Sequence, residues 1–490
     1  MVVLRSGFVI LVCAGVSGAL AERPAGTQVA QALGSQAPAA ILSSPPAADS
    51  FALPADRAEK PATSPTVPAA SPPAAQAGGL PAVAPAAQPA APVAAKPKAP
   101  APLRFAAVSK DPRPTLDPET FVNTMRAAER HHAIAAAGGW GVLPKGTTLK
   151  AGDKGELVTK LKERLAASDD LARDTLPGDA FDQAAVQAVK RFQARHGLPE
   201  TGLVGPRTVE ALNVPAEARA RQLTGSAQRL VGSRFPFGER YVVVNIPSAT
   251  VEAVEKGQVA RRYVAVVGKK DRASPTVMAR IQTVNFNPTW TVPASLIRKD
   301  IIPHVRKEPG YLAKMKIRIL DGQGREVDPA TIDWSTEKAA DYTLRQDPGA
   351  GNSLGQVRID MPNRHAVYMH DTPTKKLFSR DDRFHSSGCV RVGDVKAFAA
   401  WLLEGTPGPA GASWSAADID AAVAAGKRQD AALKRSVPVA WVYMTGFATP
   451  DGTVHFRDDV YALDAEPAPM KPEPTIADLI TSSIGPKPTF

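Results

Sequence analysis

Residues 22 to about 103 consist almost entirely of Ala, Pro, Ser, Gly and Val, and this tract is the feature that most constrains how the chain can fold. A segment of this composition buries too little apolar surface to offset the conformational entropy that folding costs. Its prolines favour an extended, partly polyproline-II chain. We therefore expect a disordered tether over residues 22–115, with folded structure beginning near Leu116.

The first 21 residues have the pattern of an export signal. Arg5 supplies a positive charge, residues 7–16 form an apolar core, and Ala19–Ala21 fits a small-x-small cleavage site. The apolar run is short for a transmembrane helix, although an uncleaved anchor is the alternative reading. Cleavage would remove Cys13 and leave Cys389 as the single cysteine, so we expect no internal disulfide in the exported chain.

The formal net charge of +11 favours anionic partners such as nucleic acid, acidic lipid or a carboxylate-rich cell wall. However, Lys and Arg are scattered along the chain, without a dense basic run and with few interleaved aromatic residues. This distribution, together with the export signal, argues against a nucleic-acid partner. We expect no cofactor, and no stable membrane insertion once the signal is cleaved.

Two helical segments follow the tether. In the first, residues 116–148, an Asp-Pro pair and a Gly-Gly pair are suited to the start and the end of a helix, which predicts a helix over Glu119–Ala137. We expect His131 and His132 to lie on the surface of this helix.

The second helical segment, residues 149–214, has the pattern of a compact three-helix module. Apolar residues recur at helical spacing in two stretches, and Thr208–Leu212 predicts a short third helix. The residues expected to form its core are Val158, Leu161, Leu165, Phe181, Ala185, Val189 and Phe192.

From residue 240 the pattern changes to short strands separated by Gly and Pro turns, which predicts a mainly β domain over residues 240–464. Residues 295–345 are less regular, and we expect them to be an insertion over the β core. Residues 465–490 are expected to be a loose tail. The expected strands are Tyr241–Ile246, Ala249–Glu255, Arg262–Gly268, Ile281–Phe286, Val357–Asp360 and Ala366–Met369, followed by helices at Val395–Leu403 and Asp418–Ala424 and a hairpin of Val437–Thr445 with Thr453–Phe456.

His370 and Cys389 are the residues in which we expect the chemistry to lie. A thiol nucleophile needs a base, because the thiolate is the attacking species. Gly388 allows the backbone to approach a substrate carbonyl, and the amides of Gly388 and Cys389 are candidates for an oxyanion hole. A buried inert cysteine is the alternative, but the polar, turn-forming neighbours of Cys389 argue against it.

These motifs, taken together, resemble the periplasmic L,D-transpeptidases with a YkuD-type catalytic domain. The resemblance covers residues 121–464 and is greatest to the larger Gram-negative subtype. It implies a β-sandwich catalytic domain with short helices and a capping insertion, preceded by a peptidoglycan-binding module. The residues that carry it are Gly152-Asp153-x-Gly155, Phe192-Gln193, Gly202-x-x-Gly205-x-x-Thr208, Asn287-Pro288-x-Trp290, Pro348-Gly349-x-x-Asn352, His370-Asp371-Thr372-Pro373, Ser387-Gly388-Cys389-x-Arg391 and Phe456-Arg457-x-Asp459-x-Tyr461.

The resemblance implies an acyl transfer through a thioester. Cys389 would attack the carbonyl before the terminal D-alanine of a stem tetrapeptide, with His370 as base and then acid. An amine of a neighbouring stem would resolve the thioester into a 3→3 cross-link. The family is also expected to be acylated by carbapenem-type β-lactams.

The substrate contacts that the resemblance implies are Arg391, Tyr368, Asn352 and Ser387. Many family members have His at the position of Ser387, so a second catalytic histidine there is excluded. Arg391 fits either a substrate carboxylate or a structural ion pair. Asn352 fits either a substrate contact or a turn.

Three other readings stay open. His365, His370 and His385 with Asp371 could hold zinc in a wall peptidase, although no H-E-x-x-H motif is present and Cys389 is then unexplained. The chain could instead be a non-catalytic wall-binding scaffold. The same thioester could also be resolved by water, by a free D-amino acid or by a protein lysine.

Overall fold

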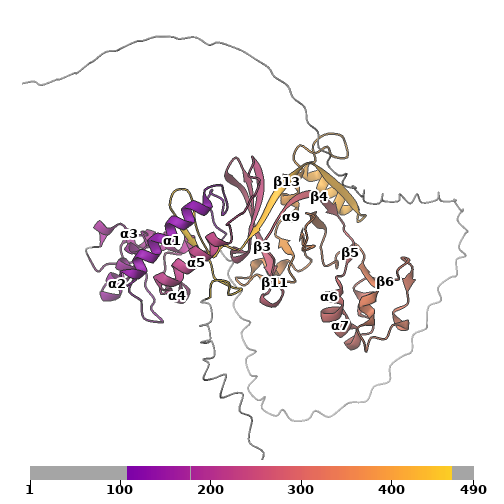
Figure 1. The fold of residues 1–490 in the computed structure, drawn as a ribbon, viewed down its shortest axis with the longest axis horizontal. Helices are drawn as coiled ribbons and strands as arrows, with labels where there is room; N and C mark the ends of the chain where they lie inside the picture. The colour runs from indigo at the N-terminus through magenta and orange to yellow at the C-terminus, as the bar shows by residue number, and fades with distance from the viewer. Residues whose placement is uncertain (1–107, 177, 466–490) are drawn as a thin grey trace, which may run out of the picture. The chain divides into compact units, whose positions relative to one another are not determined.

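The computed structural model describes residues 108–176 and 178–465 (Figure 1). The predicted export signal, most of the predicted tether and nearly all of the predicted tail therefore lie outside the described residues. No helix in the described ranges is long and apolar enough to cross a bilayer.

The first described residues correct the predicted end of the tether. Thr115 is buried, and its backbone N–H and hydroxyl both donate to the carboxylate of Glu252, at 2.8 and 3.0 Å. Arg262 donates to the carbonyl oxygens of Ser109 and Asp111. Residues 108–115 are thus fixed against the β domain by polar contacts that their composition did not indicate.

Helix α1 spans Thr120–Ala136, which confirms the predicted first helix. The amide of Gly139 bonds to the carbonyl of Ile134, and φ of 98° at Gly138 and 74° at Gly139 explains the glycines at its end. The expected surface position of His131 is wrong. Its ring is buried between Trp140 and Phe456, because α1 is covered by other elements on that side.

The three-helix module consists of α2 (Glu156–Ala166), α3 (Gln183–Arg195) and α4 (Pro206–Leu212). All seven apolar residues expected in its core are buried in one cluster. Helix α5 (Ala216–Gln228) was not predicted. It packs with α1 against the hairpin of β14 (Gly446–Ala448) and β15 (Val454–Phe456) in a separate small core.

The β domain is built on one sheet in the order β11-β3-β12-β10-β9-β4-β13-β1-β2, and β2 also pairs with β3. That last pairing joins the two ends, so eight strands form a closed ring with β11 added to β3. The mainly β architecture is confirmed. The strands are β1 (Arg240–Asn245), β2 (Thr250–Glu255), β3 (Gln258–Gly268), β4 (Val277–Phe286), β9 (Val357–Asp360), β10 (Met369–His370), β11 (Phe384–Ser386), β12 (Val390–Val392) and β13 (Gln429–Val442).

Strand β1 shows why this sheet folds as it does. Val242 and Val244 enter the main core, while Tyr241 and Val243 enter a second cluster on the other side. A strand that is buried on both faces requires an uninterrupted apolar run. Helices α9 (Val395–Leu403) and α10 (Ala416–Ala424) cover the main core.

The expected insertion has a hydrophobic core of its own, which we call the cap (residues 290–346, orange in Figure 1). A four-stranded sheet, β5-β8-β6-β7, supports its helices. Its elements are β5 (Trp290–Thr291), α6 (Ala294–Leu296), the π-helix η4 (Ile297–Ile301), α7 (Ile302–Lys307), α8 (Tyr311–Lys314), β6 (Ile317–Leu320), β7 (Glu326–Val327) and β8 (Thr343–Gln346). The short 3-10 helices are η1 (Arg173–Thr175), η2 (Ile246–Ser248), η3 (Lys270–Arg272), η5 (Pro329–Thr331), η6 (Lys338–Asp341) and η7 (Lys375–Ser379).

Two predicted β elements differ from the structure. The strand expected at Ala366–Met369 is shortened to β10, because Ala366 has φ of 51° in a turn. The long strand β13 begins at Gln429 and pairs with β1 and β4 inside the sheet, so the hairpin partner of β15 is β14 instead.

Candidate active site

Side-chain alternation places the expected catalytic residues on one face of the sheet. In β12, Val390 and Val392 are buried in the main core, so Cys389 and Arg391 face the other way. Met369 of β10 is in the same core, which turns His370 away from it as well.

The strand register then brings these side chains together. His370 pairs with Arg391 across the parallel β10–β12 ladder and with Arg358 across the antiparallel β10–β9 ladder. Residues that pair directly lie on the same face as near neighbours. Cys389 and His370 are thus held by adjacent strands, although 19 positions separate them in the sequence.

Cys389 opens into a cavity of about 460 Å³ between the sheet and the cap. Tyr368, Arg358 and Asn285 line the sheet side, and Trp290 and Arg345 line the cap side. Sequence reasoning missed this set apart from Tyr368. The remaining lining residues are Pro288, Thr289, Thr291, Pro293, Leu354, Ala366 and Arg428.

The imidazole of His370 is buried, and its Nδ1 lies 2.5 Å from the backbone oxygen of Asp371. A carbonyl can only accept, so Nδ1 carries the proton and Nε2 is left as the basic nitrogen. Burial, with a smaller effect from the charge of Arg391, lowers the pKa of His370 to about 3. The ring is therefore neutral at neutral pH.

The thiol of Cys389 is also neutral in the resting site. Burial raises its pKa, while a backbone hydrogen bond from Tyr368 and the charges of Arg391 and Arg358 lower it less. If the neutral imidazole of His370 is to activate the neutral thiol of Cys389, the proton must be transferred at the moment of attack. The nearby guanidinium groups stabilise the thiolate that forms.

Arg391 has no carboxylate partner in the described ranges, and its buried Nε has no hydrogen-bond partner. Arg391 therefore forms no structural ion pair within the described residues, which leaves the contact with a substrate carboxylate as its other predicted role. Its charge acts instead on Cys389 and His370.

The N–H of Gly388, which the sequence predicted as an oxyanion donor, donates to Ser386 Oγ at 3.2 Å within the loop, where Gly388 has φ of 112°. The N–H of Cys389 has no acceptor in the part of the chain that is described, so it is the remaining backbone candidate. The Gly388 carbonyl accepts from Ser274 Oγ at 2.7 Å, which fixes the loop.

Ser387 joins the catalytic loop to the cap. Its Oγ accepts from Arg272 Nη1 at 3.1 Å, and Arg272 also donates to both carboxylate oxygens of Asp300 in η4, at 2.6 and 3.1 Å. Ser387 is exposed beside Cys389 but already has this partner.

Asn352 is not available for substrate, so that expectation is wrong. Its Nδ2 donates to the carbonyls of Pro288 and Asp347, and its Oδ1 accepts from the N–H of Leu354. The side chain is 1% exposed. It is the turn residue of the alternative reading.

The histidines proposed for zinc do not converge. The described residues contain no group of three or more His, Cys, Asp or Glu side chains that could hold a metal. His365 is exposed in a turn beside Arg364, and His385 bonds to the backbone of Asp382. The carboxylate of Asp371 is taken by Lys375 and by the N–H of Gln356.

Of the three cavity arginines that the sequence analysis did not predict, one could have been predicted from its strand pattern. Arg358 alternates with the apolar residues Val357 and Ile359, so its strand face was predictable. Arg345 and Arg428 reach the cavity from β8 and from the residue before β13, and their positions depend on pairings that short strands do not specify.

Comparison with known proteins agrees with this geometry. Residues 239–409 match the family model of the YkuD L,D-transpeptidase catalytic domain, and residues 154–212 match that of a "Putative peptidoglycan binding domain". A curated protein of Haemophilus influenzae, described as "Putative L,D-transpeptidase", is 33% identical over 247 residues. The alignment covers 50% of this chain and 48% of that relative, or about half the length of each.

Two solved structures are also similar in part. An L,D-transpeptidase of Xylanimonas cellulosilytica has 17% identity and a TM-score of 0.20, and the match covers 61% of this chain and 99% of that one. One of Stackebrandtia nassauensis has 16% identity and a TM-score of 0.23, over 53% and 91%. By these family models, residues 239–409 form a YkuD-type L,D-transpeptidase catalytic domain, and the region before it, residues 154–212, matches a "Putative peptidoglycan binding domain".

Proposed function

We propose that the chain is an L,D-transpeptidase that forms 3→3 cross-links in peptidoglycan through a thioester on Cys389. The observation that carries this proposal is the position of Cys389 directly before β12, with His370 on the adjacent strand β10. The thiol opens into the cavity, and the Nδ1–H bond to Asp371 leaves Nε2 of His370 as the base.

In the first step, the thiol sulfur bonds to the carbonyl carbon before the terminal D-alanine. Its proton passes to His370 Nε2, and the N–H of Cys389 would donate to the developing oxyanion. The carbon–nitrogen bond then breaks, the proton passes to the leaving amine, and D-alanine departs. In the second step, the nitrogen of an acceptor amine bonds to the thioester carbonyl carbon and gives up a proton to His370. The carbon–sulfur bond then breaks, and His370 returns the proton to the sulfur of Cys389.

The charges around the cavity suit an anionic donor. A stem peptide carries carboxylates, and Arg345, Arg358 and Arg428 all line the cavity. Arg358 and Arg428 are paired with Asp360 and Asp430, whereas Arg345 has no carboxylate partner among the described residues. Arg345 is therefore the guanidinium most available for a substrate carboxylate.

The cap is proposed to limit water at the thioester, because water and an amine compete for the same carbonyl. The contact of Arg272 with both Asp300 and Ser387 supports this role, since it fixes the cap beside the nucleophile. Hydrolysis, exchange with a free D-amino acid and anchoring to a protein lysine are alternative outcomes of the same acyl-enzyme.

The proposal extends to location and organisation. The chain would be exported to the periplasm by residues 1–21, and residues 22–107 would act as a tether. Residues 149–214 would bind the wall, while residues 240–464 catalyse. A non-catalytic scaffold is the competing function, and the cavity at Cys389 argues against it.

The test is mass spectrometry of products after incubation with disaccharide-tetrapeptide. Wild type should release D-alanine and form a 3→3 dimer, and Cys389→Ala should do neither. Release of D-alanine without a dimer would replace cross-linking with hydrolysis or anchoring. Equal dimer formation by the two proteins would reject the thiol mechanism.

A further inference from the structure

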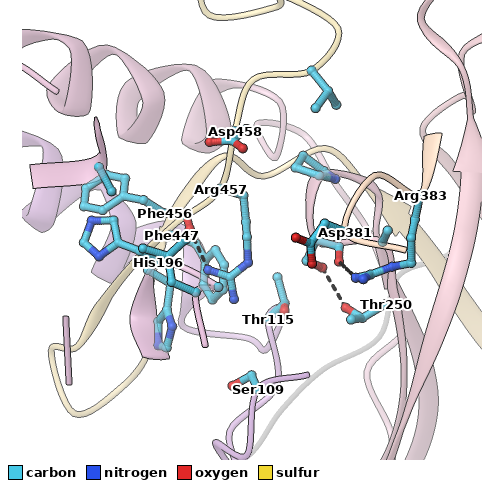
Figure 2. Close-up of a pocket in the computed structure, with 18 of the residues that line it drawn as sticks. Ser109, Thr115, His196, Thr250, Asp381, Arg383, Phe447, Phe456, Arg457 and Asp458 are labelled. Carbon is cyan, nitrogen blue, oxygen red and sulfur yellow. Dashed lines mark hydrogen bonds between the residues drawn. The ribbon is translucent and has the colours of Figure 1, made fainter. Parts of the chain in front are cut away.

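A second cavity, of about 230 Å³, lies where the three-helix module, the segment 108–115 and the β domain meet (Figure 2). It is separate from the cavity at Cys389, because none of its lining residues is shared with that cavity. His196 and Leu198 come from the module, and Arg383 and Arg457 come from the β domain.

Three arginines on its wall are neutralised by carboxylates. Arg113 pairs with Asp111 at 2.7 Å, Arg262 with Glu252 at 3.0 Å and Arg207 with Asp381 at 2.8 Å. These pairs account for the acidic side chains that lie inside the cavity wall. Two further acids, Glu210 and Asp458, are exposed at its edge.

Three other arginines on the same wall have no carboxylate partner in the described ranges. Arg457 donates to the carbonyls of Arg195 and Phe456, at 2.9 and 2.6 Å. Arg383 donates to the carbonyls of Arg380 and Ser248. Arg219 donates to Gln222 Oε1 and to the carbonyl of Ala211.

Two of these unpaired arginines, Arg219 and Arg383, are buried, and Arg457 is half-buried. Arg219 is 6% exposed and Arg383 is 4% exposed, and the Nε of each has no hydrogen-bond partner. Burying a charge without a counter-ion is costly, even when neutral oxygens solvate it. Burial lowers the pKa of Arg219 to about 9 and that of Arg457 to about 10, and the charge of Asp458 offsets only part of this lowering at each.

The backbone at Gly197 allows the guanidinium of Arg457 to approach closely. Gly197 has φ of 66°, and a Cβ there would lie 3.1 Å from Arg457 Nε and 3.3 Å from its Cζ. A Cβ at this position would require the Arg457 side chain to shift slightly. Figure 2 shows Arg457 between Phe456 and Thr115, with Arg383 on the other side of Asp381.

Apolar groups complete the wall, namely Leu198, Ala211, Phe384, Phe447 and Val460. A bare inorganic anion would leave this surface unused. A carboxylate with a short apolar part would satisfy both the charge and the apolar contacts.

We propose that this cavity binds the carboxylate end of a short peptide, and that under the proposed function this peptide is a stem of the wall polymer. The site would hold a second stem away from Cys389, with the guanidinium groups of Arg383, Arg219 and Arg457 as its counter-charges. The identity of the peptide rests on the proposed function, whereas the anion site itself rests on the cavity.

The experiment is calorimetric titration of the full chain carrying Cys389→Ala, so that no acyl transfer takes place. The probes are the stem tetrapeptide with a free C-terminal carboxylate and the same peptide as its C-terminal amide. We expect two binding sites for the acid, and weaker binding of the amide at one of them.

Variants assign the sites. Arg383→Gln and Arg457→Gln should each weaken one site by about tenfold or more, since each removes a charge-assisted contact. Arg345→Gln should weaken only the other site. Arg280→Gln, an exposed arginine on β4 outside both cavities, is the matched control and should change neither.

Arg383 and Arg457 also donate to backbone carbonyls, so thermal unfolding of each variant is measured to check that it folds. Ala211→Leu is a second test, because it fills the cavity without removing a charge. Loss of one site in a folded Ala211→Leu protein supports the proposal. A single site that responds to Arg345→Gln alone would overturn it, and so would equal binding of acid and amide. Neither result touches the proposed function, which wild-type product formation tests separately.

Discussion

Replacement of Arg272 by Ala should open the cap to water without unfolding the protein. Arg272 bridges Asp300 of the cap and Ser387 of the catalytic loop, at 2.6 and 3.1 Å. Its side chain is 15% exposed and that of Asp300 is 41% exposed, so the pair is only partly screened by solvent.

The expected size of the effect on cap closure follows from the partial exposure of this ion pair. A partly exposed ion pair contributes about 1 kcal/mol, which corresponds to roughly a fivefold change in the closed population. We expect the ratio of cross-linked dimer to hydrolysed tripeptide to fall about fivefold, because water then competes better for the thioester. The assay is the quantification of both products from disaccharide-tetrapeptide by liquid chromatography and mass spectrometry.

Arg298→Ala is the matched control. Arg298 lies in the same π-helix η4 but pairs with Glu337 inside the cap, at 3.1 Å, and does not reach the catalytic loop. Its product ratio should equal that of wild type. An unchanged ratio in Arg272→Ala, or an equal fall in both variants, would refute the bridging role.

Three further predictions follow from the described contacts. Gly355→Ala should abolish activity, because φ is 63° and its Cβ would lie 2.5 Å from Asp371 Cγ, next to the carbonyl that orients His370; product formation and thermal unfolding measure this. The free energy of unfolding should fall by up to about 3 kcal/mol as the pH drops from about 6.5 towards 4, through the titration of His131. Burial lowers the pKa of His131 to about 4 in the folded protein, so the unfolded chain binds the proton first. In His131→Phe, urea titrations should show a smaller dependence of this free energy on pH. Phe192→Ala should cost about 3–5 kcal/mol in the module core and reduce binding to wall sacculi in a pelleting assay, while turnover of soluble muropeptide persists.

The parts of the fold that sequence predicted are those with strong local periodicity. Phe192 and Leu161 recur at helical spacing, and Val243 lies in an uninterrupted apolar run, so the module and β1 were predictable. The closure of the ring by β2 and β3 was not, because it depends on pairings between strands and not on the composition of either. Helix α5 was missed because its apolar positions are mostly Ala, which also occurs in loops.

The residues of the candidate site likewise fall into those that the sequence could predict and those that it could not. Cys389 and His370 were predictable because their chemistry requires those residue types. The roles of Gly388 and Asn352 were not, since a backbone amide or a side-chain amide acts according to the direction of a loop that only the tertiary structure sets. The carbonyl of Asp371, which orients His370, leaves no side-chain signal at all.

The most direct test of the central claim is intact-mass analysis of the protein after brief exposure to disaccharide-tetrapeptide without an acceptor amine. We predict an adduct on Cys389 with the mass of the substrate minus D-alanine, which is lost on treatment with hydroxylamine, as a thioester should be. In His370→Gln the adduct should form far more slowly, and in Cys389→Ala it should be absent. An adduct of the same mass in Cys389→Ala, or release of D-alanine without any adduct in wild type, would contradict the account.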